Sequence, residues 1–260
     1  MSSEPPRYLL EFAVEVAWRA GRIALAHYQT GITAQTKPDA SPVTEADRGA
    51  EQIARALIEN KFPHDGILGE EFGSVRPQAT RRWILDPIDG TRTFLRGVPL
   101  FGCLLAVEED HEAIVGVMYF PALDETVYGA RGEGAWWNGR RALVSDVTSL
   151  DNALLLTTSV ENIEQNAARS GAWNRLRSRA GMTRTWGDCY GHALVATGRA
   201  EAMLDPLMNV WDSAPIKPII EEAGGVFTDW DGKATHTGDS AISTNTALAR
   251  EIRAYLNGTA

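Results

Sequence analysis

Apolar residues recur at a helical period close to the start of the chain. They lie three or four positions apart from Leu9 to Ile23, and Arg19 falls off that stripe. This period is typical of an amphipathic helix that turns one face to a core. It predicts a helix that ends near Tyr28, before Gly31.

A second helix is predicted to begin after Thr44. Thr44 is followed three residues later by Asp47, which is the spacing of a capping box. Apolar residues then recur at helical spacing over 53–58, and the helix is expected to end before Phe62. Residues 35–43, between the two helices, are polar with two prolines and predict a loop.

Short apolar runs bounded by turn residues predict strands. They cover 67–68, 83–85, 101–107, 113–120, 125–130, 153–158, 183–186, 200–204, 226–229 and 241–244. Further helices are predicted over 163–180, 188–197, 212–223 and 248–256. Strands separated by helices in this way favour helices packed on sheets in alternating layers.

Prolines modify two of these elements. Pro87 cannot donate a ladder hydrogen bond, so the strand over 83–85 is expected to end there. In the helix over 212–223, Pro215 is expected in the first turn, where proline is tolerated. Pro218 lies deeper and is expected to kink or break that helix.

Composition narrows the class of protein. The chain has 260 residues, of which 44% are hydrophobic, enough for a large core. Its net charge is −9, from 25 basic and 34 acidic residues, and no basic block occurs. Neither nucleic acid nor a membrane surface is therefore an expected partner. The two cysteines lie far apart and lack the spacing of metal ligands. The sequence shows no recognisable signal peptide and no apolar run long enough to span a membrane, so a cytoplasmic protein is expected.

Two carboxylates follow the strand predicted over 83–85. Asp86 and Asp89 lie three residues apart, so they can present hard oxygen ligands to one point. Gly90 lets the backbone come close to a ligand, and free N–H groups at such a turn suit a phosphate. Asp-Pro and Asp-Gly are also ordinary turn signals, and for this stretch alone that interpretation is favoured.

The twelve residues Trp83–Phe94 resemble the signature of the inositol monophosphatase family, Mg-dependent phosphatases of small phosphate monoesters. Four further motifs resemble that family in the expected order, namely Lys37–Asp47, Gly69–Glu71, Trp211–Ala214 and Glu222–Gly225. Five ordered motifs are far more specific than any single one. The resemblance implies a layered α/β/α/β/α sandwich of the inositol monophosphatase and fructose-1,6-bisphosphatase type. It also implies a homodimer, and the likeliest division into two halves falls between 1–145 and 146–260.

The resemblance implies two or three Mg²⁺ ions and a set of ligands for them. Glu70, Asp86 and the carbonyl of Ile88 would hold one ion. Asp86, Asp89 and Asp212 would hold a second, and a weaker third would lie near Glu70. Several clustered carboxylates repel one another unless a cation is present, and Mg²⁺ suits such oxygen ligands. Taken alone, Asp212 is better explained as a helix N-cap than as a metal ligand.

Catalytic roles also follow from the resemblance, for Thr91, Asp47 and Glu70. Thr91 and Asp47 would pair and orient the attacking water, and the backbone N–H groups of Gly90 and Thr91 would hold phosphate oxygens. Taken alone, Asp47 is a helix cap and Glu70 a solvated loop end. For Lys37, a surface lysine is slightly favoured over one that closes over the site.

Three features resemble the histidinol-phosphatase branch of the family. They are Arg92 after the Asp-Gly-Thr turn, Arg184 with Asp188 in Arg-Thr-Trp-Gly-Asp, and Asp205 with Asn209 in Asp-Pro-Leu-Met-Asn. Asp188 and Asp205 can pair with the ammonium or protonated imidazole of histidinol phosphate, and Asn209 with a ring nitrogen. A helix N-cap explains Asp188 equally well.

Two alternatives stand beside a histidinol phosphatase. One is an inositol-1-phosphatase or a broad sugar and inositol phosphatase. The other is a metal-dependent regulator or scaffold on the same fold, against which the intact set of carboxylates argues.

Overall fold

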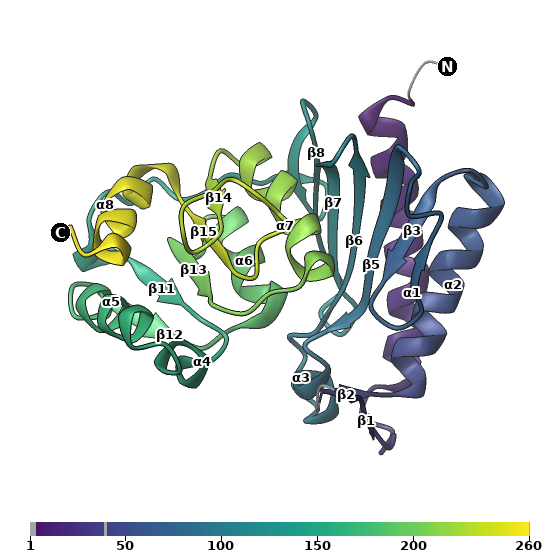
Figure 1. The fold of residues 1–260 in the computed structure, drawn as a ribbon, viewed down its shortest axis with the longest axis horizontal. Helices are drawn as coiled ribbons and strands as arrows, with labels where there is room; N and C mark the ends of the chain where they lie inside the picture. Colours follow the sequence, from purple (N-terminus) through teal and green to yellow (C-terminus); the bar gives the residue numbers. More distant parts are fainter. Residues whose placement is uncertain (1–3, 39–40, 260) are drawn as a thin grey trace.

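Two β-sheets alternate with layers of helices in an α/β/α/β/α sandwich, which confirms the expected fold class (Figure 1). The computed structural model describes residues 4–38 and 41–259, so Asp39 and Ala40 of the Lys37–Asp47 motif lie outside it. From right to left in Figure 1 the layers are α1 (Pro6–His27) with α2 (Glu45–Lys61), an eight-stranded sheet, α6 (Asp188–Ala196) with α7 (Val210–Glu222), a five-stranded sheet, and α5 (Ala167–Arg177) with α8 (Thr246–Asn257).

The eight-stranded sheet comes from one continuous part of the chain. In spatial order its strands are β10 (Arg140–Arg141), β9 (Gly134–Trp137), β8 (Glu125–Ala130), β7 (Glu112–Phe120), β6 (Gly102–Glu109), β5 (Arg81–Asp89), β3 (Gly66–Gly69) and β4 (Gly73–Val75). Only β3 and β5 pair in parallel, with Gly69 opposite Leu85. Parallel strands end at the same edge of a sheet, so Glu70 after β3 comes beside Asp86 in β5.

Both faces of the eight-stranded sheet are covered by helices. Along β6, Cys103, Leu105 and Val107 join the core under α1 and α2. Leu104, which points to the opposite face, joins the core beneath α6 and α7. A strand that is buried on both faces needs apolar side chains at every position, which explains the continuous apolar run.

The five-stranded sheet is mixed. Its strands in spatial order are β12 (Met182–Arg184), β11 (Leu154–Leu156), β13 (Ala202–Asp205), β15 (Ala241–Thr244) and β14 (Val226–Thr228). β11 pairs in parallel with both β12 and β13. The outer face carries a core to which α5 contributes Trp173 and Leu176 and α8 contributes Leu248. Within the described residues, no helix is long and apolar enough to cross a membrane.

Three local predictions were wrong. The loop over 35–43 contains a small antiparallel pair, β1 (Gln35–Thr36) and β2 (Pro42–Val43). β4 was missed in a stretch of polar residues. The single helix expected over 163–180 is two, α4 (Val160–Glu164) and α5, because the side chain of Asn166 caps α5 by accepting from two backbone N–H groups.

The first-turn position expected for Pro215 and the possible break at Pro218 were also wrong. The helix begins after Asn209, which places Pro215 beyond the first turn, and it continues without a break through Pro218. Both prolines are buried in the middle layer. A β-carbon on Gly116 of β7 would come within 1.9 Å of the Pro215 carbonyl oxygen, so the glycine makes room for this close approach. Packing on both sides outweighs the two missing backbone donors.

Candidate active site

A bulge in β5 positions the first two carboxylates. β5 does not end at Pro87: it pairs with β6 as far as Asp89, with a register shift between Asp86 and Asp89. Pro87 and Ile88 occupy the irregular part, where a missing ladder donor costs little. Asp86 and Asp89 therefore both belong to the strand, and the bulge brings them toward one site.

Asp212 reaches the same place from the first turn of α7. It is not the N-cap of that helix but its third residue, and its Oδ2 accepts from the backbone N of Asn209 at 2.7 Å and from Nδ2 at 3.3 Å. One ligand oxygen from each of Asp86, Asp89 and Asp212 lies within 4.8 Å of the others. The structure therefore brings three of the expected metal ligands together.

Mutual repulsion and burial make this cluster electrostatically costly. Burial first, and then the charges of Glu70 and Asp89, raise the pKa of Asp86 well above its usual range. Burial, followed by the charges of Asp188 and Asp212, does the same to the pKa of Asp89. Burial raises the pKa of Asp212 from 3.8 to about 6. In the described part of the chain no basic side chain pairs with the three, so a hard cation fits their oxygen donors.

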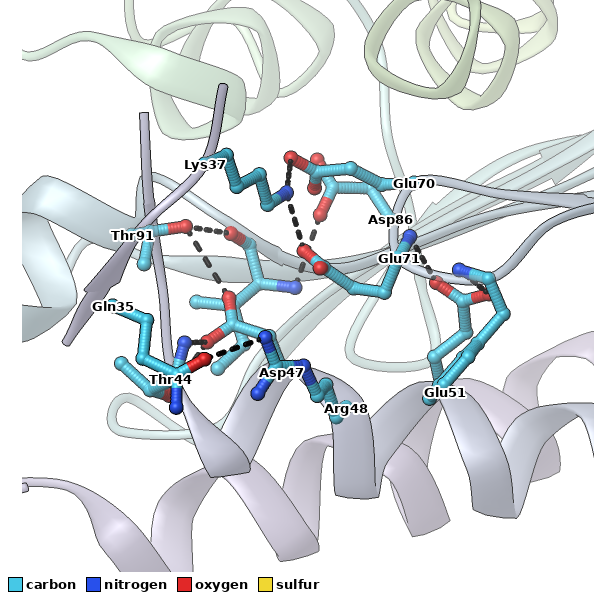
Figure 2. Close-up of polar contacts among 12 residues, drawn as sticks. Gln35, Lys37, Thr44, Asp47, Arg48, Glu51, Glu70, Glu71, Asp86 and Thr91 are labelled. Carbon is cyan, nitrogen blue, oxygen red and sulfur yellow. Dashed lines mark hydrogen bonds and ion pairs between the residues drawn. The ribbon is translucent and has the colours of Figure 1, made fainter. Parts of the chain in front are cut away.

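Glu70 stands beside this cluster but is held by a lysine (Figure 2). Nζ of Lys37 donates to Oε1 of Glu70 at 2.7 Å and to Oε1 of Glu71 at 2.6 Å. The Lys37 side chain is only 16% exposed, so the favoured interpretation as a surface lysine was wrong. Burial raises the pKa of Glu71 to about 7, although the Lys37 ammonium opposes that shift.

Asp47 caps α2 and also contacts Thr91. Its Oδ2 accepts from the backbone N of Thr44 at 2.7 Å and from Oγ1 at 2.6 Å, which closes the capping box of α2. Its Oδ1 lies 3.3 Å from Oγ1 of Thr91, and that hydroxyl is 3.1 Å from the carbonyl of Ile88 (Figure 2). Burial raises the pKa of Asp47. The helix cap thus fixes a carboxylate next to the Thr91 hydroxyl.

A cavity of about 170 Å³ opens beside the carboxylate cluster. Its lining residues are Asp89, Leu104, Thr158, Asn162, Asp188, Cys189, Asp205, Pro206, Leu207, Met208, Asp212 and Ile216. Four of them are carboxylates, and the lining contains no lysine, arginine or histidine. The cavity therefore favours a group that carries positive charge or donates hydrogen bonds.

The carboxyl ends of parallel strands build the far wall of this cavity. Asp205 is the last residue of β13, and Thr158 follows β11. The backbone N of Thr158 donates to Oδ1 of Asp205 at 3.0 Å and its Oγ1 donates to Oδ2 at 2.9 Å. Oγ1 also accepts from the backbone N of Asp188 at 2.7 Å. Thr158 therefore joins the two acidic residues of the predicted substrate site.

Asp188 is held from a second side by the short helix α3 (Thr91–Leu95). Its Oδ2 accepts from Oγ1 of Thr93 at 2.8 Å. A β-carbon on Gly90, which has φ of +80°, would lie 2.8 Å from the same oxygen. Asp188 is the first residue of α6 with φ of +52°, and the N-cap is Gly187, so the N-cap interpretation of Asp188 was wrong.

Four predicted substrate residues lie outside the cavity lining, namely Gly90, Thr91, Arg184 and Asn209. Arg184 is exposed, donates to the carbonyl of its neighbour Thr183 at 2.8 Å, and places its guanidinium 6.0 Å from the Trp186 ring centre. Asn209 is exposed and holds Asp212.

Sequence reasoning missed Thr93 and Thr158. A usable signal existed for Thr158, since it is the polar last residue of the strand predicted over 153–158.

The fold and the carboxylate site together define a class of enzyme. Residues 6–258 match the profile of the inositol monophosphatase family, so the chain belongs to this metal-dependent family and is a phosphoric monoester hydrolase. It is 42% identical to the histidinol-phosphatase of Chlorobaculum parvum over 249 residues, which covers 95% of this chain and 96% of that protein. It is 38% identical to the histidinol-phosphatase of Mycobacterium tuberculosis over 257 residues, or 95% and 97% of the two chains. A solved inositol monophosphatase from Zymomonas mobilis superposes with a TM-score of 0.87 at 32% identity, covering 98% of this chain and 100% of that one.

Proposed function

We propose that this enzyme hydrolyses L-histidinol phosphate to L-histidinol and phosphate, a step of histidine biosynthesis. The observation that carries the proposal is the cavity beside the metal cluster. Besides the proposed metal ligands Asp89 and Asp212, its lining holds two more carboxylates, Asp188 and Asp205, and no basic side chain. Histidinol phosphate carries an ammonium and an imidazole, and charge-assisted hydrogen bonds to carboxylates are the strong ones. The similarity to two proteins named histidinol-phosphatase supports the same substrate.

Asp188 and Asp205 are the proposed contacts of the cationic groups. Both line the cavity, and Thr158 holds them side by side. Arg184 and Asn209 stay in the proposal as substrate contacts, although each would need a substrate that reaches past the cavity lining.

The proposed cofactor is Mg²⁺, as two or three ions. Glu70, Asp86 and the carbonyl of Ile88 would hold one, Asp86, Asp89 and Asp212 a second, and a third would lie near Glu70. The compact oxygen-only group of Asp86, Asp89 and Asp212 supports this assignment. When bound, the ions would neutralise phosphate charge and make hydroxide available near neutral pH.

The residues around the cluster have proposed parts in catalysis. Thr91 and Asp47 would orient the water for in-line attack on phosphorus, and their 3.3 Å contact supports a shared role. Glu70 would join them once Lys37 releases its carboxylate. The backbone N–H groups of Gly90 and Thr91, at the start of α3, would hold phosphate oxygens.

An inositol-1-phosphatase, or a broad sugar and inositol phosphatase, is the second candidate. The similarity to the Zymomonas mobilis inositol monophosphatase favours it. Against it, neutral inositol hydroxyls do not need an anionic cavity wall.

Phosphate release from four substrates, with Mg²⁺ and with excess chelator, tests the proposal. The substrates are histidinol phosphate, inositol 1-phosphate, fructose 1,6-bisphosphate and adenosine 3′,5′-bisphosphate. The highest kcat/KM is expected for histidinol phosphate, and only with Mg²⁺. A higher value for inositol 1-phosphate would move the enzyme to the second candidate.

The proposal includes a cytoplasmic homodimer and a division into halves over 1–145 and 146–260. The strand content supports the division, because the eight-stranded sheet ends at Arg141 and the five-stranded sheet begins at Leu154. Light scattering of the purified protein would test the dimer.

A further inference from the structure

A fully buried histidine stands behind Asp205. His192 lies in α6 with 0% of its surface exposed. Its Nδ1 is 2.7 Å from Oγ of Ser243, and its Nε2 is 3.5 Å from Oδ2 of Asp205. Within the described residues Nε2 has no hydrogen-bond partner. A buried imidazole therefore directs an unpaired nitrogen at a proposed substrate contact.

The Ser243 hydroxyl can donate to Nδ1 or accept from it, so the neighbouring Asp205 charge decides which ring nitrogen carries the proton. Ser243 is itself fully buried on β15, which pairs with β13, the strand that ends in Asp205. If Nδ1 carried the proton, the lone pair of Nε2 would face the Asp205 carboxylate, and the two would repel. The favourable arrangement has the Ser243 hydroxyl donating to Nδ1, so that Nε2–H points at Asp205.

The two hydrogen bonds that Thr158 makes to Asp205 have the same direction. Asp188 N donates to Thr158 Oγ1, which leaves the Thr158 hydroxyl proton for Oδ2 of Asp205. Thr158 N donates to Oδ1. A buried carboxylate is costly unless donors surround it. Thr158 supplies two hydrogen bonds from one side, and His192 Nε2 lies 3.5 Å behind Oδ2, where its N–H is a favourable dipole without making a hydrogen bond.

We propose that His192 and Ser243 are positioning residues for substrate specificity. They hold Asp205 as an acceptor whose remaining lone pairs face the cavity, where a substrate ammonium or imidazolium can pair with it. His192 does not touch the substrate; it acts through Asp205. This inference rests on the proposed function, because Asp205 is its substrate contact.

Variants of the whole chain, assayed with Mg²⁺, test this. His192→Phe keeps a buried ring without a donor, whereas His192→Gln places an amide N–H near the position of Nε2. Ser243→Ala removes the hydroxyl that fixes the ring tautomer. The matched control is Thr244→Val on the same strand, because the Thr244 hydroxyl is buried without a partner. The readout is kcat/KM for histidinol phosphate divided by that for 4-nitrophenyl phosphate, which lacks a cationic group.

His192→Phe and Ser243→Ala are expected to lower this ratio by about three- to tenfold, mainly by raising KM for histidinol phosphate. His192→Gln should recover most of the loss, and Thr244→Val should keep the wild-type ratio. If His192→Phe fails to fold, Ser243→Ala and His192→Gln carry the test. An unchanged ratio in Ser243→Ala or in folded His192→Phe, or equal losses on both substrates, would overturn the inference.

The result also separates this inference from the proposed function. A wild-type enzyme that does not prefer histidinol phosphate refutes the proposed function. In that case the positioning role of His192 is tested with L-histidinol, which carries the same cationic groups, as a competitive inhibitor of 4-nitrophenyl phosphate hydrolysis. A Ki raised about threefold or more in Ser243→Ala supports the positioning role, and an equal Ki overturns it.

Discussion

The Thr93 hydroxyl donates a hydrogen bond of 2.8 Å to Oδ2 of Asp188, across 95 residues of sequence. Thr93 lies in α3, directly after the metal motif, and Asp188 begins α6 beneath the five-stranded sheet. The contact joins α3, which follows the carboxylates of β5, to the acidic wall of the cavity. It fixes the orientation of the Asp188 carboxylate.

Substitution of Asp188 tests its part in specificity. Asp188→Asn is expected to lower kcat/KM for histidinol phosphate by about ten- to a hundredfold, since a charge-assisted hydrogen bond contributes about 1.5–3 kcal/mol. Hydrolysis of 4-nitrophenyl phosphate should fall much less. Asp151→Asn, at a side chain that is 68% exposed, is the control. Equal losses on both substrates would show that Asp188 is structural.

Asp86 is the residue whose loss should affect the metal site most. Asp86→Asn is expected to lower kcat by about a thousandfold or more, because its carboxylate would serve two ions. The melting temperature of the metal-free variant should rise, since a carboxylate is removed from a repelling cluster. Calorimetry and phosphate release measure the two effects. Full wild-type activity in excess chelator would contradict a metal role.

Thr91 is expected to act on the chemical step. Thr91→Ala should lower kcat by about 10²–10⁴-fold while Mg²⁺ binding, measured by titration calorimetry, persists. The reason is the position of Oγ1 between Asp47 and the carbonyl of Ile88, where it can orient a water. Mass spectrometry of the enzyme during turnover is the check on this role: a phosphorylated Thr91 would mean that the threonine itself attacks.

The metal-free protein should lose stability as pH rises. The folded-state pKa of Asp212 is about 6 instead of 3.8, and those of Asp86 and Asp89 are also raised. Such groups hold protons in the folded protein that the unfolded chain has released, so their contribution is complete below the unfolded pKa and is lost as pH rises through the folded pKa. The melting temperature in chelator is expected to fall by about 5 °C between pH 5 and pH 8.

Magnesium provides the control for that pH series. Saturating Mg²⁺ should remove most of the decrease in melting temperature, because the cation replaces the protons that neutralise the carboxylates. A melting temperature in chelator that rises over the same pH range would contradict the proposed repulsion.

Gly187 is expected to be required for the geometry of the acidic wall. A β-carbon there would lie 2.3 Å from Cα of Thr158, a backbone atom that cannot move aside cheaply. Gly187→Ala should destabilise the protein by about 1–3 kcal/mol in urea unfolding. Gly171→Ala is the matched control, since a β-carbon at that helical position meets nothing closer than 3.5 Å and alanine favours helices. Equal stability of the two variants would mean that the backbone relaxes.

Local patterns were sufficient wherever one period or one cap dominates. The apolar stripe of α1 and the Thr44–Asp47 capping box of α2 are both found as predicted. Local patterns gave wrong predictions where the local signal conflicts with tertiary packing. α7 runs unbroken through Pro218 because it is buried between two sheets, and β5 continues past Pro87 because a bulge accommodates it.

The sequence by itself determined the family, through motifs in a fixed order, and with it the fold and the carboxylates proposed as metal ligands. Only the tertiary structure decided how those residues are held. Three contacts show this, each between residues that are not neighbours in the chain. Lys37 donates to Glu70, Thr93 donates to Asp188, and His192 lies behind Asp205. Such contacts leave no periodic or local trace, because each depends on the close approach of two backbones that the whole fold brings together.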